Sequence, residues 1–143
     1  MNESLLQEKV QSLIEKYKNA TFLHNGRSLE EGIDCLGFII LFYREFGIYI
    51  PNDDGEYISE DWYKTDPNRY IRGIQRIGGF PVSIYQLKAL DLVYFAISHN
   101  IITHTGIMIN SYEFLHMSPK TGFSLSPMDR LWERRFRGAL RLI

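Results

Sequence analysis

Hydrophobic positions recur at helical spacing in the first half of the chain. Over residues 4–18 the apolar positions are separated by charged ones, which predicts an amphipathic helix with Ser4 as its N-cap. A second helix is expected over residues 35–46 and should end at Gly47. Because this segment is apolar almost all round, we place it at the centre of the core. A shorter helix is expected over residues 68–77.

The pattern changes to short segments rich in β-forming residues after residue 90. These predicted strands cover residues 90–96, 104–109, 113–117 and 136–142. Before the last of them, Ser126 followed by Pro127 predicts one or two helical turns through Trp132. Residues 20–33 and 50–67 predict irregular loops. Helices followed by an antiparallel sheet are typical of an α+β fold.

Composition limits the classes of function. Neither a repeat nor a linker divides residues 1–143, so we expect a single domain. The 16 Lys and Arg residues against 17 Asp and Glu leave a formal net charge of −1, which argues against broad nucleic-acid binding. Apolar runs are shorter than the roughly 18 to 20 residues that span a membrane. The first residues lack the features of a signal peptide, so we expect synthesis in the cytoplasm without one.

Cys35 is the only cysteine, which excludes an intrachain disulfide and a four-cysteine zinc site. It follows Asp34 at the first turn of the predicted central helix, where unpaired backbone N–H groups and the helix dipole favour a thiolate. Two interpretations remain open: Cys35 is a nucleophile, or it fills space behind a capping Asp34. Gly37 leaves room for close approach by another backbone or a substrate.

Two of the four histidines fall within apolar strands. His24 and His99 lie in predicted loops, whereas a hairpin with a tip at residues 109–111 would put His104 directly opposite His116. Such a pair fits a catalytic base with its orienting group, a core pair whose hydrogen bonds are satisfied, or part of a metal site. Because no carboxylate or second thiol lies nearby in sequence, we expect neither a metal nor another cofactor.

Four motifs occur in a fixed order along the chain. They are residues 32–37 with 42–48, residues 89–95, residues 103–107 and residues 114–116. In this order they resemble the nucleophile helix and the strand motifs of the NlpC/P60 cysteine peptidases, from about residue 20 to the C-terminus. Residues 21–27 and 132–142 resemble the phage-type wall peptidases of that family, which are often encoded with tail genes.

The resemblance implies a papain-like α+β fold and hydrolysis of an amide in the peptidoglycan stem peptide, typically after D-γ-glutamate. It assigns Cys35 as the nucleophile, His104 as the general base and acid, and His116 as the residue that orients His104. Phage-tail or tail-like particle proteins are the implied partners, and such a particle would deliver the enzyme to the cell wall.

Residues near the nucleophile are candidates for substrate contacts. Asp34 matches a position that in some members holds the free amine of the substrate. Many members carry an upstream tyrosine whose hydroxyl supports the oxyanion; this chain has no phenol there, and His24 is the candidate replacement. Trp62, with Tyr63 and Tyr70, either lines one wall of the substrate cleft or packs under a loop.

Two alternatives keep the fold and change the function. Leu36 replaces the serine common after the cysteine, which together with the missing tyrosine favours a catalytically weak or inactive structural component of a tail tip. The other alternative is a thiol acyltransferase or amidase acting on a different acyl group, which an apolar groove would mark. A thiol pKa well below its ordinary value would support the enzyme over the structural component.

Overall fold

The computed structural model describes residues 2–51, 62–97 and 100–143. Its elements are α1 (Glu3–Tyr17), β1 (Arg27–Ser28), β2 (Gly32–Ile33), α2 (Cys35–Arg44), α3 (Trp62–Thr65), α4 (Arg69–Ile77), β3 (Phe80–Pro81), the 3-10 helix η1 (Ile84–Gln86), β4 (Leu92–Ala96), β5 (Ile102–Met108), β6 (Glu113–Ser118), β7 (Gly122–Pro127), α5 (Arg130–Arg135) and β8 (Phe136–Arg141). Most helices precede most strands, which confirms the predicted α+β order.

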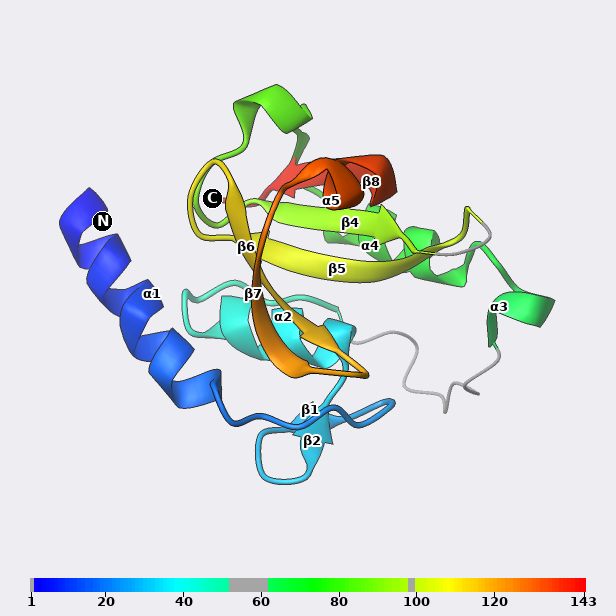
Figure 1. Ribbon diagram of the computed structural model, residues 1–143, viewed down its shortest axis with the longest axis horizontal. Coiled ribbons are helices and arrows are strands. Elements are labelled where there is room, and N and C mark those ends of the chain that lie inside the picture. Colours follow the sequence, from blue (N-terminus) through cyan, green and yellow to red (C-terminus); the bar gives the residue numbers. More distant parts are fainter. Residues whose placement is uncertain (1, 52–61, 98–99) are drawn as a thin grey trace.

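The strands β3 to β8 form one antiparallel sheet in the order β3-β8-β4-β5-β6-β7 (Figure 1). Helix α2 contacts β5 and β6, whereas α5 contacts β4. The buried side chains form two clusters: Phe38 and Ile107 belong to the one that includes α2, and Phe95 and Phe114 to the one against α5. The sheet therefore separates two apolar layers, and α2 is held in the larger of them.

Helix α2 begins at the cysteine because the preceding aspartate caps it. The Asp34 carboxylate accepts a hydrogen bond from the Gly37 N–H (2.7 Å), which satisfies one of the N–H groups left free at a helix start. Phe38, Phe42 and Tyr43 are fully buried. This confirms the prediction of a central, almost completely apolar helix with Cys35 in its first turn.

Two predicted helix starts are wrong. The N-cap of α1 is Asn2, whose side chain accepts from the Leu5 N–H (2.8 Å), so Ser4 lies inside the helix. Ser126 and Pro127 end strand β7, because pairing with β6 overrides the local helix signal. Proline is tolerated there since β7 is an edge strand. The cap of α5 is instead Asp129.

The segment predicted as an irregular loop over 50–67 is partly helical. Residues 62–65 form the single turn α3, and residues 52–61 lie outside the described residues. His99, expected in a solvated turn, also lies outside them. The first loop, residues 20–33, contains the small hairpin of β1 and β2, which stands beside the start of α2.

The hairpin of β5 and β6 has a different register from the predicted one. Met108 pairs with Phe114, which centres the turn on Ser111 rather than on Asn110. The Asn110 side chain explains the difference, because its Oδ1 accepts from the backbone N–H of Glu113 (2.7 Å) and so closes the tip one residue later.

This register changes how the two strand histidines meet. His116 lies across from Gly106 rather than directly opposite His104, and a Cβ added at Gly106 would lie 3.5 Å from the Cβ of His116. The predicted direct opposition is therefore wrong by two residues. Because side chains alternate with a period of two, this shift keeps both imidazoles on one face, and they meet diagonally.

Candidate active site

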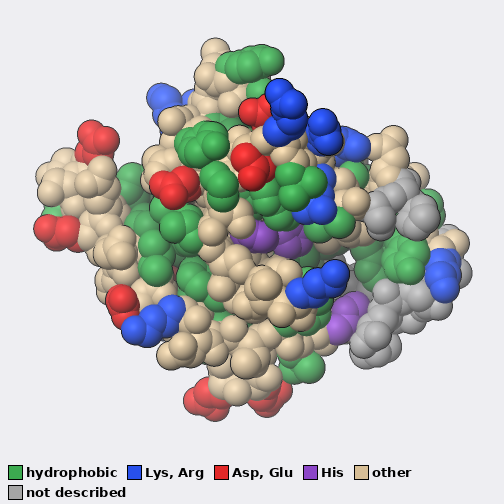
Figure 2. Space-filling model, viewed as in Figure 1, with side chains coloured by type: hydrophobic (Ala, Val, Ile, Leu, Met, Phe, Trp, Pro, Cys, Tyr) green, Lys and Arg blue, Asp and Glu red, His purple; other side chains and the backbone are tan. Residues whose placement is uncertain are grey.

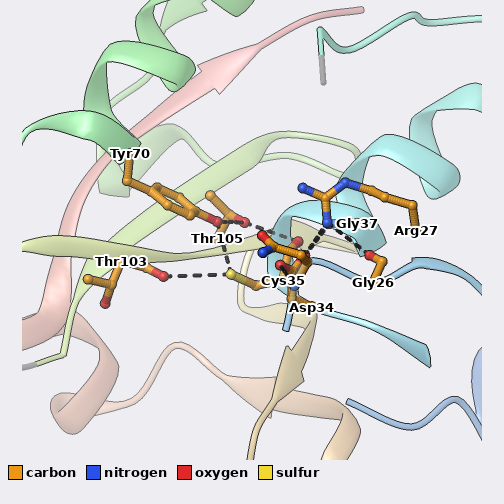
Figure 3. A network of polar contacts seen from close by, with 9 residues as sticks. Gly26, Arg27, Asp34, Cys35, Gly37, Tyr70, Thr103 and Thr105 are labelled. Atoms are coloured by element: carbon orange, nitrogen blue, oxygen red, sulfur yellow. Dashed lines mark hydrogen bonds and ion pairs between the residues drawn. The ribbon is translucent and has the colours of Figure 1, made fainter. Parts of the chain in front are cut away.

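The sulfur of Cys35 lies at a junction of α2, α4 and β5 (Figure 3). Its Sγ is 2.9 Å from the Tyr70 hydroxyl and 3.6 Å from the Thr103 carbonyl oxygen. The Thr105 hydroxyl donates to the Cys35 carbonyl oxygen (3.4 Å), so residues on both sides of His104 contact Cys35. The side chain is only 9% exposed.

A cavity of about 330 Å³ opens beside this sulfur. All six candidate site residues except one line it: Cys35, His104, Asp34, His24 and Trp62. The exception is His116, which reaches the site through His104. The tertiary structure thus brings together residues that lie far apart in the sequence, and it supports the wall-lining interpretation of Trp62.

The two strand histidines form a direct hydrogen bond. Nε2 of His104 lies 2.8 Å from Nδ1 of His116, and Nε2 of His116 lies 2.8 Å from the Ser126 hydroxyl. The other ring nitrogen of His104, Nδ1, takes no part in the hydrogen bond with His116. If His104 donates from Nε2, then Nδ1 carries the lone pair that a general base needs.

Trp132 of α5 fixes the orientation of both rings. Its indole stacks on His104 at 5.8 Å between ring centroids and meets His116 edge-on at 5.1 Å. The guanidinium of Arg135 covers the indole at 4.7 Å from its centroid. Figure 2 shows histidine near the centre of one face, with hydrophobic side chains next to it.

Burial keeps both histidines neutral. It lowers the pKa of His104 to about 3, and the neighbouring His116 and Arg135 act in the same direction. Burial and Arg135 lower the pKa of His116 to about 4. Around neutral pH, the pair is therefore uncharged and each ring has one N–H and one lone pair.

Stability should consequently fall on acidification. Between the ordinary histidine pKa of 6.5 and the lowered values, the unfolded chain binds protons that the folded protein excludes. Each imidazole should then cost about 1 kcal/mol of unfolding free energy for each pH unit below 6.5. Urea unfolding at pH 7 and at pH 5, above and below the ordinary histidine pKa, should show this loss of unfolding free energy.

The matched variant is His116→Gln, which removes one of the two titrating groups. Its unfolding free energy should depend less steeply on pH than that of the wild type, because only His104 still resists protonation. Parallel pH profiles for the two proteins would contradict the assignment of a lowered pKa to His116.

The thiol differs from the expected activated thiolate. Burial and the Asp34 carboxylate raise the pKa of Cys35 to about 11, and hydrogen bonds from Tyr70 and Thr105 only partly oppose this. The expected low pKa is therefore not found, because the sulfur is too deeply buried for the helix start to ionise it. A neutral thiol that lines the same cavity as the neutral His104 imidazole requires a base to remove its proton during attack.

Asp34 is already engaged by the protein. Its Oδ1 accepts from Arg27 (2.8 Å) as well as from Gly37, and its Oδ2 accepts from the Asn25 N–H (2.9 Å). The ion pair with Arg27 is largely shielded from solvent. Asp34 thus acts as the helix cap and also contributes charge to the cavity wall.

Sequence reasoning missed the role of one phenol. The stretch before Cys35 has no tyrosine, but α4 brings the Tyr70 hydroxyl to the sulfur, and its ring stacks on Trp62 at 6.1 Å. Burial raises the pKa of Tyr70 well above its ordinary value, so the hydroxyl keeps its proton. The only sequence signal was the aromatic cluster of Trp62, Tyr63 and Tyr70, which does not specify a contact 35 residues away.

In residues 2–51, 62–97 and 100–143, no group of three or more His, Cys, Asp or Glu side chains is placed to hold a metal ion. Among the helices of these residues, none has both the length and the apolar character needed to cross a bilayer.

Solved structures share this fold. An NlpC/P60 family protein from Bacillus cereus aligns with a TM-score of 0.67 and 20% identity over 94% of this chain and 39% of its own. A protein from Staphylococcus aureus, described as similar to lipoprotein, NLP/P60 family, aligns with a TM-score of 0.66 and 21% identity. The alignment covers 100% of this chain and 43% of that one. The NlpC/p60 domain of the peptidoglycan hydrolase SagA aligns with a TM-score of 0.64 and 19% identity, over 95% of this chain and 98% of that one. The fold is therefore papain-like, as the motifs predicted.

Curated relatives agree with these structures. The murein DD-endopeptidase MepS/murein LD-carboxypeptidase of Escherichia coli K12 is 31% identical over 120 residues, 82% of this chain and 54% of that protein. A probable endopeptidase NlpC homolog of Haemophilus influenzae is 28% identical over the same shares. The chain spans about half the length of these relatives. Residues 19–141 match the NlpC/P60 family, and the chain belongs to it.

Proposed function

We propose that this protein is a cysteine peptidase that hydrolyses an amide bond in the stem peptide of peptidoglycan. The observation that carries the proposal is that Cys35, at the start of α2, and His104 line the same cavity, and that His104 is hydrogen-bonded to His116. The names of the relatives, murein endopeptidase and peptidoglycan hydrolase, support the substrate class.

The first step is attack by sulfur. His104 accepts the thiol proton at Nδ1 while the Cys35 sulfur forms a bond to the carbonyl carbon of the substrate. The carbonyl π electrons move to oxygen, and the backbone N–H of Cys35 at the first turn of α2 stabilises the resulting oxyanion. Nδ1 of His116 accepts a hydrogen bond from the Nε2–H of His104 and so stabilises the imidazolium.

The second step releases the amine. The His104 imidazolium gives its proton to the leaving nitrogen, the carbon–nitrogen bond breaks, and the acyl group stays on Cys35. Water then attacks the thioester with His104 as the base, and the peptide acid leaves while the thiol regains its proton. The Ser126 hydroxyl, bonded to His116, keeps the second ring in place throughout.

The proposed bond is the one after D-γ-glutamate. Mass spectrometry of defined stem peptides after incubation with the protein reports both activity and bond. Fragments ending in D-γ-glutamate would support this specificity, whereas cleavage elsewhere in the stem peptide would retain the peptidase and reject the bond. The resemblance of residues 32–37 to the family's nucleophile motif supports the choice.

Asp34→Asn separates the two roles of this carboxylate. Asparagine caps helices as well as aspartate does, so α2 should keep its start, but the charge proposed to hold a free substrate amine is lost. KM for a stem peptide with a free N-terminal amine should rise about tenfold, the magnitude of one charged hydrogen bond. The same peptide with an acetylated amine is the control and should show no change in KM between the two proteins; an equal rise for both peptides would refute amine binding.

A second candidate function is favoured by the composition of the cavity wall. Ile74 and Ile77 of α4, together with Ile97, Ile101 and Trp62, line the cavity beside the more polar side formed by Asp34. Such a surface suits the transfer or hydrolysis of an apolar acyl group by the same thiol. Incubation with thioesters of increasing acyl chain length tests this candidate. It is supported if the amount of acyl adduct on Cys35 increases with chain length, and it is rejected if no adduct forms.

Carriage by a phage tail or phage-like particle is part of the proposal. It is supported by the resemblance of residues 21–27 and 132–142 to the phage-type wall peptidases. Delivery of the protein to the wall would then depend on the particle. Mass spectrometry of purified particles from a strain that encodes this chain should detect it, and particles without it would reject this assignment while leaving the peptidase intact.

A further inference from the structure

Three hydroxyl and thiol groups form a short chain behind the nucleophile. The Tyr70 oxygen lies 2.9 Å from the Cys35 sulfur and 3.0 Å from the Thr105 hydroxyl oxygen. The Thr105 hydroxyl in turn donates to the carbonyl oxygen of Cys35 (3.4 Å). Figure 3 shows these side chains converging from α4, β5 and α2. This chain of hydrogen bonds therefore begins at the sulfur of Cys35 and ends at its carbonyl oxygen.

The number of hydrogens limits how this chain can be arranged. Tyr70 has one hydroxyl hydrogen and two neighbouring acceptors, the Cys35 sulfur and the Thr105 oxygen. When the sulfur is a thiol, its hydrogen can go to the Thr103 carbonyl oxygen (3.6 Å) or to the Tyr70 oxygen, and in the second arrangement the Tyr70 hydrogen goes to Thr105. When the sulfur is a thiolate, it has no hydrogen to give, and only the phenol can donate across the 2.9 Å contact.

We propose that Tyr70 is a catalytic residue whose hydroxyl turns from Thr105 to the Cys35 sulfur as the sulfur loses its proton, and that Thr105 is a positioning residue that competes for the same hydrogen. The inference rests on the proposed role of Cys35 as the nucleophile. The sulfur proton passes to His104 at Nδ1, and the Tyr70 hydrogen changes its acceptor without leaving oxygen. No other bond is made or broken, so the step is balanced.

The structure favours a phenol for this role. The Tyr70 ring is held by stacking on Trp62 at 6.1 Å, so the hydroxyl needs only to rotate about its own bond. Burial raises the pKa of Tyr70 well above its ordinary value, which keeps it a donor. A buried thiolate without a donor would bear the full cost of desolvation, since charged groups in low dielectric need hydrogen bonds.

Other charged and titratable groups also act on this sulfur. Besides Tyr70, those that face it or line its cavity are Asp34, the N-cap of α2, His104 of β5, Arg27 of β1, Tyr63 of α3, Arg69 of α4 and His24 in the first loop. Replacing the hydroxyl of Tyr70 or of Thr105 changes none of these charges. A change in thiolate population in such variants can therefore be attributed to the hydroxyl chain.

Two substitutions should change the thiolate population in opposite directions. In Tyr70→Phe the thiolate loses its phenol donor and keeps only the hydrogen bonds from Thr105. In Thr105→Val the phenol loses its alternative acceptor and donates to sulfur throughout, and we expect this gain to exceed the loss of the Thr105 hydroxyl, which itself lowers the thiol pKa. Below the thiol pKa, the rate of alkylation by iodoacetamide is proportional to the thiolate fraction. At pH 8, a pH below the thiol pKa, Tyr70→Phe should react about tenfold more slowly than the wild type, and Thr105→Val about threefold faster.

The control variants isolate the hydroxyl groups. Thr105→Ser restores a hydroxyl and should return the rate to the wild-type value, and Tyr85→Phe removes a phenol that is 93% exposed and should leave it unchanged. Thermal unfolding confirms that each variant is folded; if Thr105→Val does not fold, Thr105→Ala takes its place in the comparison with Thr105→Ser. Slower or unchanged alkylation in the hydroxyl-free Thr105 variant, or an unchanged rate in Tyr70→Phe, would overturn the proposal.

Alkylation requires no peptide, so this result is independent of the proposed function. If stem peptides are not cleaved while the opposite changes in alkylation rate are observed, the peptidase assignment fails and the hydroxyl chain stands. If peptides are cleaved and both variants are alkylated at the wild-type rate, the proposed role of the hydroxyl chain is rejected and the peptidase assignment stands. The two proposals can therefore be rejected separately.

Discussion

Cys35→Ala should abolish hydrolysis of stem peptides, with a loss of at least about 10³-fold in kcat. The alanine leaves no atom to form the thioester, and the remaining groups can only polarise a carbonyl. The substitution removes one sulfur from a site beside a cavity, so the fold should be retained. Mass spectrometry of defined peptides measures the loss, and unfolding in urea confirms the fold.

The double variant tests whether the residues act as a unit. His104→Ala alone should cause a loss similar to that of Cys35→Ala, and Cys35→Ala with His104→Ala should be no worse than either, because each variant already removes the same step. Equal turnover by the wild type and Cys35→Ala would eliminate Cys35 as the nucleophile. Turnover by neither would favour the alternative of an inactive structural component.

Gly37→Ala should strongly destabilise the protein. A Cβ at this position in α2 would lie 2.2 Å from the carbonyl oxygen of Gly26, which is backbone and cannot rotate away. The first loop or the start of α2 must therefore move, at an expected cost of about 3 kcal/mol in unfolding free energy. Urea unfolding at neutral pH measures this cost.

Gly73→Ala is the matched control, because it introduces the same methyl group into another helix. Nothing lies within 4 Å of a Cβ at Gly73 in α4. Alanine is the better helix former, so this variant should be as stable as the wild type or up to about 1 kcal/mol more stable. A loss of the same size in both variants would show that the contact with Gly26 is not the cause.

The local signals were strongest where one residue acts on its own backbone. Asp34 before an apolar segment predicted a capped central helix, and the cap is present. The strands at 92–96 and 136–141 lie within one or two residues of their predicted bounds. Errors arose where a distant strand competed with a local signal: Pro127 reads as a helix start, but pairing with β6 makes it the end of a strand.

The register of the hairpin of β5 and β6 could not be predicted from the sequence for a similar reason. One asparagine side chain, that of Asn110, shifts the turn by one residue, and no spacing rule distinguishes the two tips. The contact between His104 and His116 survived because the shift moves the pairing by two residues. That His104 and His116 share one face of the sheet was therefore predictable from the two-residue period of a strand, but their direct pairing across the hairpin was not.

The sequence by itself determined which residue types were available for chemistry and which segments could be helix or strand, since both follow from short-range preferences. Only the tertiary structure decided that Tyr70 reaches the sulfur and that the thiol stays protonated. Both depend on how α4 packs beside β5, and burial raises the cost of charge only once the surrounding elements have excluded water.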